Sequence, residues 1–166
     1  MVQNGMYYVK QDLYDIVRSL KGDVGDPRHR PVICLIPSEE SEQLFWAIPM
    51  GNLNHRTNSQ IERIHKYMSY PDNDIRSCYY HIGRTTNDSI FFISDVLPVI
   101  DKYIEAEHLG ADKKHFILKN PVLIKELQRK VYRVLSYENS SPNRFRQHIT
   151  DTKNYLLEEL VVIERK

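Results

Sequence analysis

Two short apolar segments, separated by a polar connection, constrain the fold of this chain more than any other feature. The first runs from Pro31 to Ile36 and the second from Leu44 to Met50, and the residues from Ser38 to Glu42 between them are polar. Apolar runs of this length, bounded by turn-forming residues, are typical of buried strands. We therefore expect the two segments to form a hairpin in the core.

Helices are indicated where apolar residues recur at helical spacing or where capping residues precede such a pattern. The predicted helices are Gln11 to Lys21, Thr57 or Asn58 to Met68, Ser94 or Asp95 to His108, Asn120 to about Tyr137, and the segment after Ser141-Pro142. In the last one, the predicted buried stripe comprises Phe145, Ile149, Thr152, Leu156, Leu160 and Ile163.

Two further strands are expected near Cys78 to Ile82 and Ser89 to Ile93, with Asn87-Asp88 in the turn between them. The chain has 166 residues, which suits one domain with its own core. The expected fold is α+β, with a mainly antiparallel β-sheet surrounded by four to five α-helices.

The distribution of charge is more informative than its total. The net charge is +1, yet residues 113–166 hold 12 Lys and Arg against 6 Asp and Glu. A basic C-terminal third on a near-neutral chain suggests a polyanionic partner, although solvated helix faces explain the same excess.

The two cysteines, Cys34 and Cys78, fall in apolar segments and are expected to be buried free thiols, too few for a zinc site. The first residues, Met1 to Lys10, lack the apolar segment of a signal peptide. No apolar run reaches the roughly 18 residues of a membrane span. We therefore expect a cytoplasmic protein with no membrane partner.

The segment from Pro49 to Arg56 is the most suggestive for chemistry. It leaves an apolar strand, enters a helix N-terminus and contains Asn52, Asn54, His55 and Arg56. A helix N-terminus offers N–H donors to a phosphate, an imidazole can exchange protons near neutral pH, and a guanidinium can bind phosphate through two hydrogen bonds. A plain turn, with Asn54 or Thr57 capping the helix, is the alternative.

These groups match the needs of RNA cleavage by transesterification, which requires a base, an acid and stabilisation of the phosphorane, but no metal ion. His55 is the candidate for proton transfer, and Arg56, Asn52 and Asn54 are candidates for holding the phosphate. Ser59, in the first turn of the next helix, is a further candidate. The sequence leaves open which group is the base. A metal-dependent nuclease is disfavoured, because the acidic residues are scattered.

A second set of basic residues is expected to bind nucleic acid. Lys125, Arg129 and Arg133 are spaced four residues apart on one predicted helix. Arg28, Arg30, Arg144 and Arg146 lie near strand or helix ends. Cations of this kind bind phosphates, and neighbouring tyrosines can stack on bases.

Several strings in the chain resemble the ToxN/AbiQ superfamily of type III toxins, most closely its CptN branch. They are Tyr7-Tyr8-Val9, Arg30 to Ile36, Phe45 to Met50, Phe92 to Val99 and the helix opening at Asn120-Pro121. The resemblance covers essentially the whole chain as a pattern of apolar strings and breaks.

The resemblance implies a twisted antiparallel sheet of the MazF/Kid type and a sequence-preferring endoribonuclease that acts on cellular mRNA. It also implies a small pseudoknot RNA antitoxin, which the toxin cuts from a tandem-repeat precursor and then retains. Toxin and RNA of this family assemble into closed rings or 2:2 pairs, and no cofactor is implied.

Residue roles transfer only in part. The family's loop after the second apolar strand supplies hydroxyl and lysine groups, whereas this chain has Asn52 and Asn54 in place of the hydroxyls and His55 or Arg56 in place of the lysine. A tyrosine in the first helix also belongs to the family site, and Tyr14 is the matching residue.

The sequence therefore predicts a metal-independent endoribonuclease toxin, with His55 in acid–base chemistry and the basic residues named above holding an inhibitory RNA. The rival hypothesis is a non-catalytic RNA- or DNA-binding module that uses the basic C-terminal helices.

Overall fold

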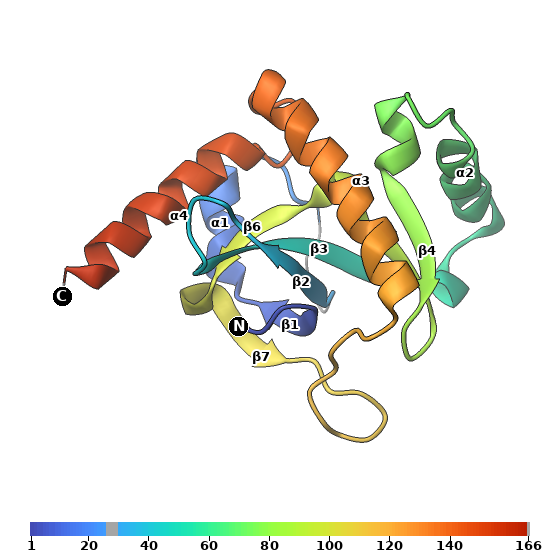
Figure 1. Cartoon of the computed structure of the whole chain (residues 1–166), viewed down its shortest axis with the longest axis horizontal. Coiled ribbons are helices and arrows are strands. Elements are labelled where there is room, and N and C mark those ends of the chain that lie inside the picture. The colour runs from blue at the N-terminus through green and yellow to red at the C-terminus, as the bar shows by residue number, and fades with distance from the viewer. Residues whose placement is uncertain (26–29, 166) are drawn as a thin grey trace.

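The computed structural model describes residues 1–25 and 30–165, and it is built around one seven-stranded sheet (Figure 1). The strands are β1 (Gly5–Val9), β2 (Val32–Pro37), β3 (Leu44–Asn52), β4 (Tyr80–Arg84), β5 (Asp88–Phe92), β6 (Leu97–Ile100) and β7 (Ile104–Glu107). Their order is β4-β5-β3-β2-β1-β7, and β6 also pairs with β3. All of these pairings are antiparallel. The predicted α+β class and antiparallel sheet are confirmed.

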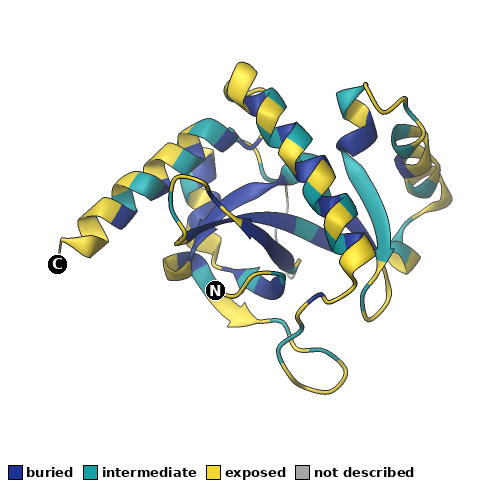
Figure 2. Ribbon diagram, viewed as in Figure 1, coloured by how far each residue is buried: buried dark blue, intermediate teal, exposed yellow. Residues whose placement is uncertain are grey.

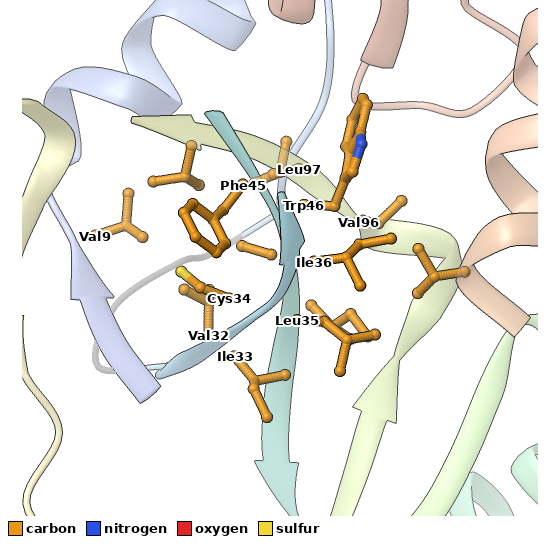
Figure 3. Close-up of a cluster of buried hydrophobic side chains, with 14 of the residues drawn as sticks. Val9, Val32, Ile33, Cys34, Leu35, Ile36, Phe45, Trp46, Val96 and Leu97 are labelled. Carbon is orange, nitrogen blue, oxygen red and sulfur yellow. The ribbon is translucent and has the colours of Figure 1, made fainter. Parts of the chain in front are cut away.

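The predicted hairpin is confirmed as β2 and β3, with Val32 opposite Pro49 and Pro37 opposite Phe45. Residues 32–36 are all buried. Because neighbouring residues of a strand point to opposite faces, an unbroken apolar run requires cover on both faces of the sheet. Figure 3 shows the side chains of this region extending to both sides of β2.

Four α-helices surround the sheet: α1 (Gln11–Ser19), α2 (Asn58–Met68), α3 (Pro121–Ser140) and α4 (Ile149–Glu164). The long helix α3 crosses the sheet and contacts β2, α4 contacts β6, and α2 lies beside β4 (Figure 1). Each helix buries one side and exposes the other (Figure 2). Such one-sided burial is the arrangement expected of amphipathic helices on a sheet.

Two helices begin at the predicted caps. The Thr57 hydroxyl accepts the N–H of Gln60, whose side chain in turn accepts the N–H of Thr57, so α2 starts with a capping box. The Asn120 side chain accepts the N–H groups of Val122 and Leu123 at the start of α3. The helical spacing of Ile61, Ile64 and Met68 predicts that these residues face inward, but only Ile64 is buried, because α2 lies at the margin of the sheet.

The helix predicted from Ser94 or Asp95 to His108 is wrong. This segment contains a 3-10 turn at Ile93–Asp95, strand β6, a second 3-10 turn at Asp101–Tyr103 and strand β7. Pro98 removes a helical hydrogen bond, and its neighbours Val96, Val99 and Ile100 are β-branched. The first half of β3 supplies the partner, with Trp46 opposite Pro98.

The last helix begins later than predicted, at Ile149 rather than after Ser141-Pro142. The residues between α3 and α4 instead form a compact turn around the buried carboxylate of Glu138, which accepts the N–H of Asn143 and the hydroxyl of Thr150. Of the predicted stripe, Phe145 is buried but precedes α4, and Ile163 is exposed.

Cys34 and Cys78 are both buried free thiols, as predicted. Cys34 lies in β2, and burial raises the pKa of its thiol to about 12. Cys78 lies in a 3-10 turn rather than in a strand.

Strand β3 changes partners along its length, and this positions the functional region. Its first half pairs with β6, whereas Met50, Gly51 and Asn52 pair with β5. Gly51 and Asn52, predicted as loop, therefore extend the strand, and only Leu53–His55 turn away as a 3-10 helix.

Candidate functional site

A cleft of about 360 Å³ opens at the end of β3, and we call it the histidine cleft. Four parts of the fold line it: the end of β3 with the turn that follows, the β4–β5 turn, β1 with the residue after β7, and the two residues before β2. Its polar lining residues are Tyr8, Arg30, Asn52, His55, Arg56, Thr85, Thr86, Asn87, Ser89 and His108. The structure thus brings together four predicted residues, Asn52, His55, Arg56 and Arg30.

The turn that presents His55 is fixed by a local hydrogen bond. The side-chain oxygen of Asn52 accepts the N–H of Asn54 at 2.9 Å. This hydrogen bond caps the N-terminus of the 3-10 helix. His55 ends this turn and is exposed. Asn54 is exposed and does not line the cleft. Of the two predicted asparagines, only Asn52 therefore lines it.

Two guanidinium groups share one aromatic ring at the wall of the cleft. The Cζ atom of Arg56 lies 5.2 Å from the centroid of Phe92, and that of Arg30 lies 5.6 Å from it. Both contacts are within cation–π range. A Cβ at position 51 would collide with the Arg56 guanidinium, so Gly51 is what allows Arg56 to lie close over the strand.

The environment of Arg56 favours an anionic ligand. Burial, with the neighbouring Arg30 as a smaller cause, lowers the pKa of Arg56. Its Nε atom is buried and has no hydrogen-bond partner among residues 1–25 and 30–165. Buried donors are almost always paired in folded proteins, so this N–H is an unsatisfied donor within the wall of the cleft.

A second imidazole, His108, also lines the cleft. Its Nδ1 atom forms a 2.8 Å hydrogen bond with the Tyr8 hydroxyl. Burial, and to a smaller extent the nearby His115, lowers the pKa of His108. The ring is therefore neutral near pH 7, and Nε2 is the nitrogen left for proton transfer.

The β4–β5 turn adds hydroxyl groups to the cleft. Thr85 Oγ1 and Ser89 Oγ are 2.8 Å apart, and Ser89 also donates to the carbonyl of Asn87 at 3.1 Å. Because β5 pairs with β3, Ser89 lies directly opposite Asn52.

Tyr8, His108, Thr85 and Ser89 were not predicted as site residues. His108 was missed because the sequence predicted a helix up to this residue, whereas it directly follows strand β7. The hydroxyls come from a turn that only the pairing of β3 with β5 brings to the cleft.

Two predicted catalytic residues lie elsewhere. Tyr14 is buried in α1 and lines a neighbouring small cavity, which shares Arg30 with the histidine cleft, and burial raises the pKa of Tyr14 to about 12. Ser59 is exposed, and its hydroxyl lies 3.1 Å from that of Thr57. Neither lines the histidine cleft.

Most of the predicted RNA-binding cations also lie away from the histidine cleft, and several have partners within the protein. Arg129 forms a salt bridge of 3.1 Å with Glu126, and Arg133 donates to the carbonyl of Asp72. Arg146 forms a 3.0 Å salt bridge with Asp95. Lys125 is exposed.

The remaining two predicted RNA-binding residues complete this set. The Cζ atom of Arg144 lies 5.7 Å from the ring centroid of Tyr137. Arg28 lies outside the described residues.

No family model matches this chain, and a search of curated proteins finds no match either. Among the described residues, no helix is both long enough and apolar enough to span a bilayer. Within the same ranges, no three His, Cys, Asp or Glu side chains are grouped as a metal site would require.

Proposed function

We propose that this protein is an endoribonuclease that cleaves RNA by transesterification in the histidine cleft. The observation that carries the proposal is the gathering of two imidazoles, His55 and His108, with two guanidiniums, Arg30 and Arg56, around one solvent-filled volume. This set contains every group that the reaction needs, namely two for proton transfer and a cationic cradle for the phosphate.

In the proposed reaction, the ribose 2′-oxygen attacks the adjacent phosphorus while the bond from phosphorus to the 5′-oxygen breaks. His108 accepts the proton of the 2′-hydroxyl, because its lowered pKa keeps the ring neutral. His55 donates a proton to the departing 5′-oxygen. The products are an RNA ending in a 2′,3′-cyclic phosphate and one beginning with a 5′-hydroxyl.

Charge develops on the non-bridging oxygens as the fifth bond to phosphorus forms. The Arg56 guanidinium, with its unpartnered Nε–H, and Arg30 stabilise this charge. Donors that are already oriented in the free protein stabilise a transition state without reorganisation. Asn52, whose side-chain oxygen already accepts from Asn54, donates to the same phosphate through its amide N–H in the proposed reaction.

The wider biological proposal rests on the resemblance of the sequence to type III toxins. The enzyme is then a cytoplasmic toxin with a MazF/Kid-type core, and a small pseudoknot RNA is its antitoxin. That RNA inhibits as a product that stays in the histidine cleft. The toxin also cleaves cellular mRNA when the antitoxin is missing.

The decisive test compares three single variants, His55→Ala, His108→Ala and His65→Ala, on a labelled RNA in excess EDTA. His65 is exposed on α2 and outside the cleft, so it is the matched control. Loss of a proton-transfer group lowers the rate by about 10²–10⁴-fold. We expect both cleft variants to lose this much while His65→Ala is unchanged.

The remaining outcomes separate the alternatives. Cleavage that survives both cleft variants would assign the chemistry to another site, and cleavage abolished by EDTA would overturn the metal-independent mechanism. RNA binding without any cleavage would leave the non-catalytic binding module. A discrete short RNA with a 2′,3′-cyclic phosphate, copurifying from the native operon, would support the toxin–antitoxin proposal.

A further inference from the structure

A second cleft, of about 480 Å³, lies next to the histidine cleft and is lined mainly by aromatic rings and arginines. We call it the aromatic cleft. Besides the buried Phe145, four rings line it: Tyr67 at the end of α2, Tyr79 and Tyr80 at the start of β4, and Phe92 at the end of β5. The rings come from three elements that meet only because β4 pairs with β5 and α2 covers β4.

The rings pack against one another and remain partly exposed. Tyr67 and Tyr79 are stacked, with centroids 5.9 Å apart and planes inclined by 21°. Tyr80 meets Phe92 edge to face at 6.1 Å. All four residues are half-buried rather than enclosed.

The aromatic cleft carries an excess of positive charge. Arg30, Arg63, Arg144 and Arg146 line it, whereas Asp95 is its one acidic lining residue and is already paired with Arg146. The Cζ atom of Arg63 lies 5.7 Å from the centroid of Tyr67. Stacking faces flanked by cations are the combination that single-stranded nucleic acid uses, since the bases stack and the phosphates are neutralised.

The two clefts adjoin each other at Arg30 and Phe92. Arg30 lines both of them. Phe92 contacts Arg56 on the side of the histidine cleft and Tyr80 on the side of the aromatic cleft. The tyrosines therefore lie one aromatic ring away from Arg56, on the far side of Phe92.

We propose that the aromatic cleft binds one or two unpaired bases of single-stranded RNA next to the phosphate held at Arg56. Arg63 and Arg144 neutralise the phosphates of these nucleotides. This inference rests on the proposed function and defines its substrate as RNA that is unpaired beside the cleaved bond. An acidic peptide does not use the stacking faces, so the bases are the groups that distinguish the two ligands.

The test uses a fluorescent 2′-O-methyl RNA oligonucleotide, which cannot be cleaved because the attacking hydroxyl is blocked. Its dissociation constant is measured by anisotropy for the unchanged protein, Tyr67→Leu, Arg63→Gln and Tyr132→Leu. Tyr67→Leu keeps apolar bulk but removes the stacking face. Tyr132 is exposed on α3, outside both clefts, and is the matched control.

We expect Tyr67→Leu to weaken binding about tenfold or more, in line with base–aromatic stacking, and Tyr132→Leu to have no effect. Arg63→Gln, at an exposed residue, should reduce the slope of log affinity against log salt by about 1. With a cleavable RNA, Tyr67→Leu should raise KM and leave kcat within about threefold. Unchanged thermal melting of each variant shows that the fold is intact.

Single abasic substitutions along the oligonucleotide make the test sharper. At the position that occupies the aromatic cleft, the abasic change should weaken binding to the unchanged protein and have no further effect on Tyr67→Leu, because both changes remove the same contact. Additive effects at every position would overturn the assignment of the bases to this cleft.

Failure of this inference is distinguishable from failure of the proposed function. If RNA is cleaved and Tyr67→Leu changes neither KM nor oligonucleotide affinity, the aromatic cleft is not a base site, while the endoribonuclease proposal stands. If Tyr67→Leu weakens RNA binding and no variant or unchanged protein cleaves RNA, the base site stands and the catalytic proposal falls. Poly-glutamate can also be used to displace the oligonucleotide from each protein. If it does so equally well from the unchanged protein and from Tyr67→Leu, the cleft binds its ligand through charge alone and the inference is overturned.

Discussion

Two sets of basic residues in this protein differ in what they contact. On α3, Arg129 pairs with Glu126, Arg133 donates to the Asp72 carbonyl, and the buried Lys130 donates to the Tyr80 carbonyl at 2.8 Å. At the histidine cleft, Arg30 and Arg56 lie over Phe92, and Arg56 Nε has no partner within residues 1–25 and 30–165.

The difference shows that a count of charges does not locate an anion-binding site. Helix α3 holds four of the 12 Lys and Arg of residues 113–166. Three of these four make contacts within α3 or with neighbouring elements. The cleft arginines come from the N-terminal part, whose net charge is negative. What distinguishes them is a guanidinium donor that is buried and unpartnered in the free protein.

The largest expected effect is therefore at Arg56. We expect Arg56→Ala to lower the single-turnover rate of RNA cleavage by about 10²–10³-fold, the effect of removing one oriented donor to a developing oxyanion. Arg56→Lys should recover only part of the rate, because an ammonium lacks the planar fork. Arg129→Ala is the matched control on α3 and should change the rate by less than about twofold.

An equal loss of cleavage rate in Arg129→Ala and Arg56→Ala would show that the α3 cations and the cleft arginines do not differ in function. The α3 face would then belong to the substrate path, and the salt bridge with Glu126 would have to open on RNA binding. Rates measured at two salt concentrations distinguish a general electrostatic effect from a local one.

Next in size is the effect of Lys130 on stability. This side chain is 5% exposed and supplies the hydrogen bond to the Tyr80 carbonyl. We expect Lys130→Ala to lower the free energy of unfolding by about 2–3 kcal/mol, since it loses buried packing and leaves a carbonyl without its donor. Lys125→Ala, one turn earlier and exposed, should stay within about 0.5 kcal/mol.

Urea denaturation monitored by circular dichroism measures both values. An equally small loss in the two variants would mean that water replaces the Lys130 ammonium at Tyr80. The inward role assigned to this residue would then be wrong.

Periodicity and capping chemistry predicted much of the fold. The hairpin of β2 and β3, the hairpin of β4 and β5, and the starts of α2 and α3 depend on signals within a few residues of each element. The segment of β6 and β7 was missed because its apolar spacing also suits a helix, whereas β6 pairs with β3 and β7 pairs with β1.

The candidate site was predictable only where it is local. Asn52, His55 and Arg56 lie within one short segment, so their nearness was visible in the sequence. His108 and Tyr8 are 100 positions apart and meet because β1 pairs with β7. Tyr14 was placed at the site by resemblance alone, and the burial of α1 against the sheet puts it in another cavity.

The α3 cations should also affect the pH dependence of stability through His81 on β4. Burial, followed by the nearby Lys130, lowers the pKa of His81 to about 4, from an ordinary 6.5. The unfolded chain therefore binds a proton between pH 6.5 and 4 that the folded protein does not. Stability from this group is complete above pH 6.5 and is lost as the pH falls toward 4.

We expect this loss to be about 2 kcal/mol, after an allowance for the partial solvent exposure of the ring. Denaturation curves at pH 7, 5.5 and 4.5 test it by comparing the unchanged protein with His81→Gln, which does not titrate. The slopes of unfolding free energy against pH for the two proteins should differ by the equivalent of up to one bound proton across this range. Parallel curves would show that His81 is protonated in the folded protein.

The smallest expected effect is that of the salt bridge between Arg129 and Glu126. These two residues are three positions apart on α3, and both side chains are about 40% exposed. Its coupling free energy in a double-mutant cycle with Arg129→Ala and Glu126→Ala should be about 0.3–0.5 kcal/mol and should fall as salt is added. The same cycle measured on RNA affinity should give no coupling, because a pair whose role is internal contributes equally to free and bound protein. A coupling on RNA affinity larger than that on stability would show that Glu126 holds Arg129 for the ligand, and α3 would then join the cleft arginines as an RNA-binding surface.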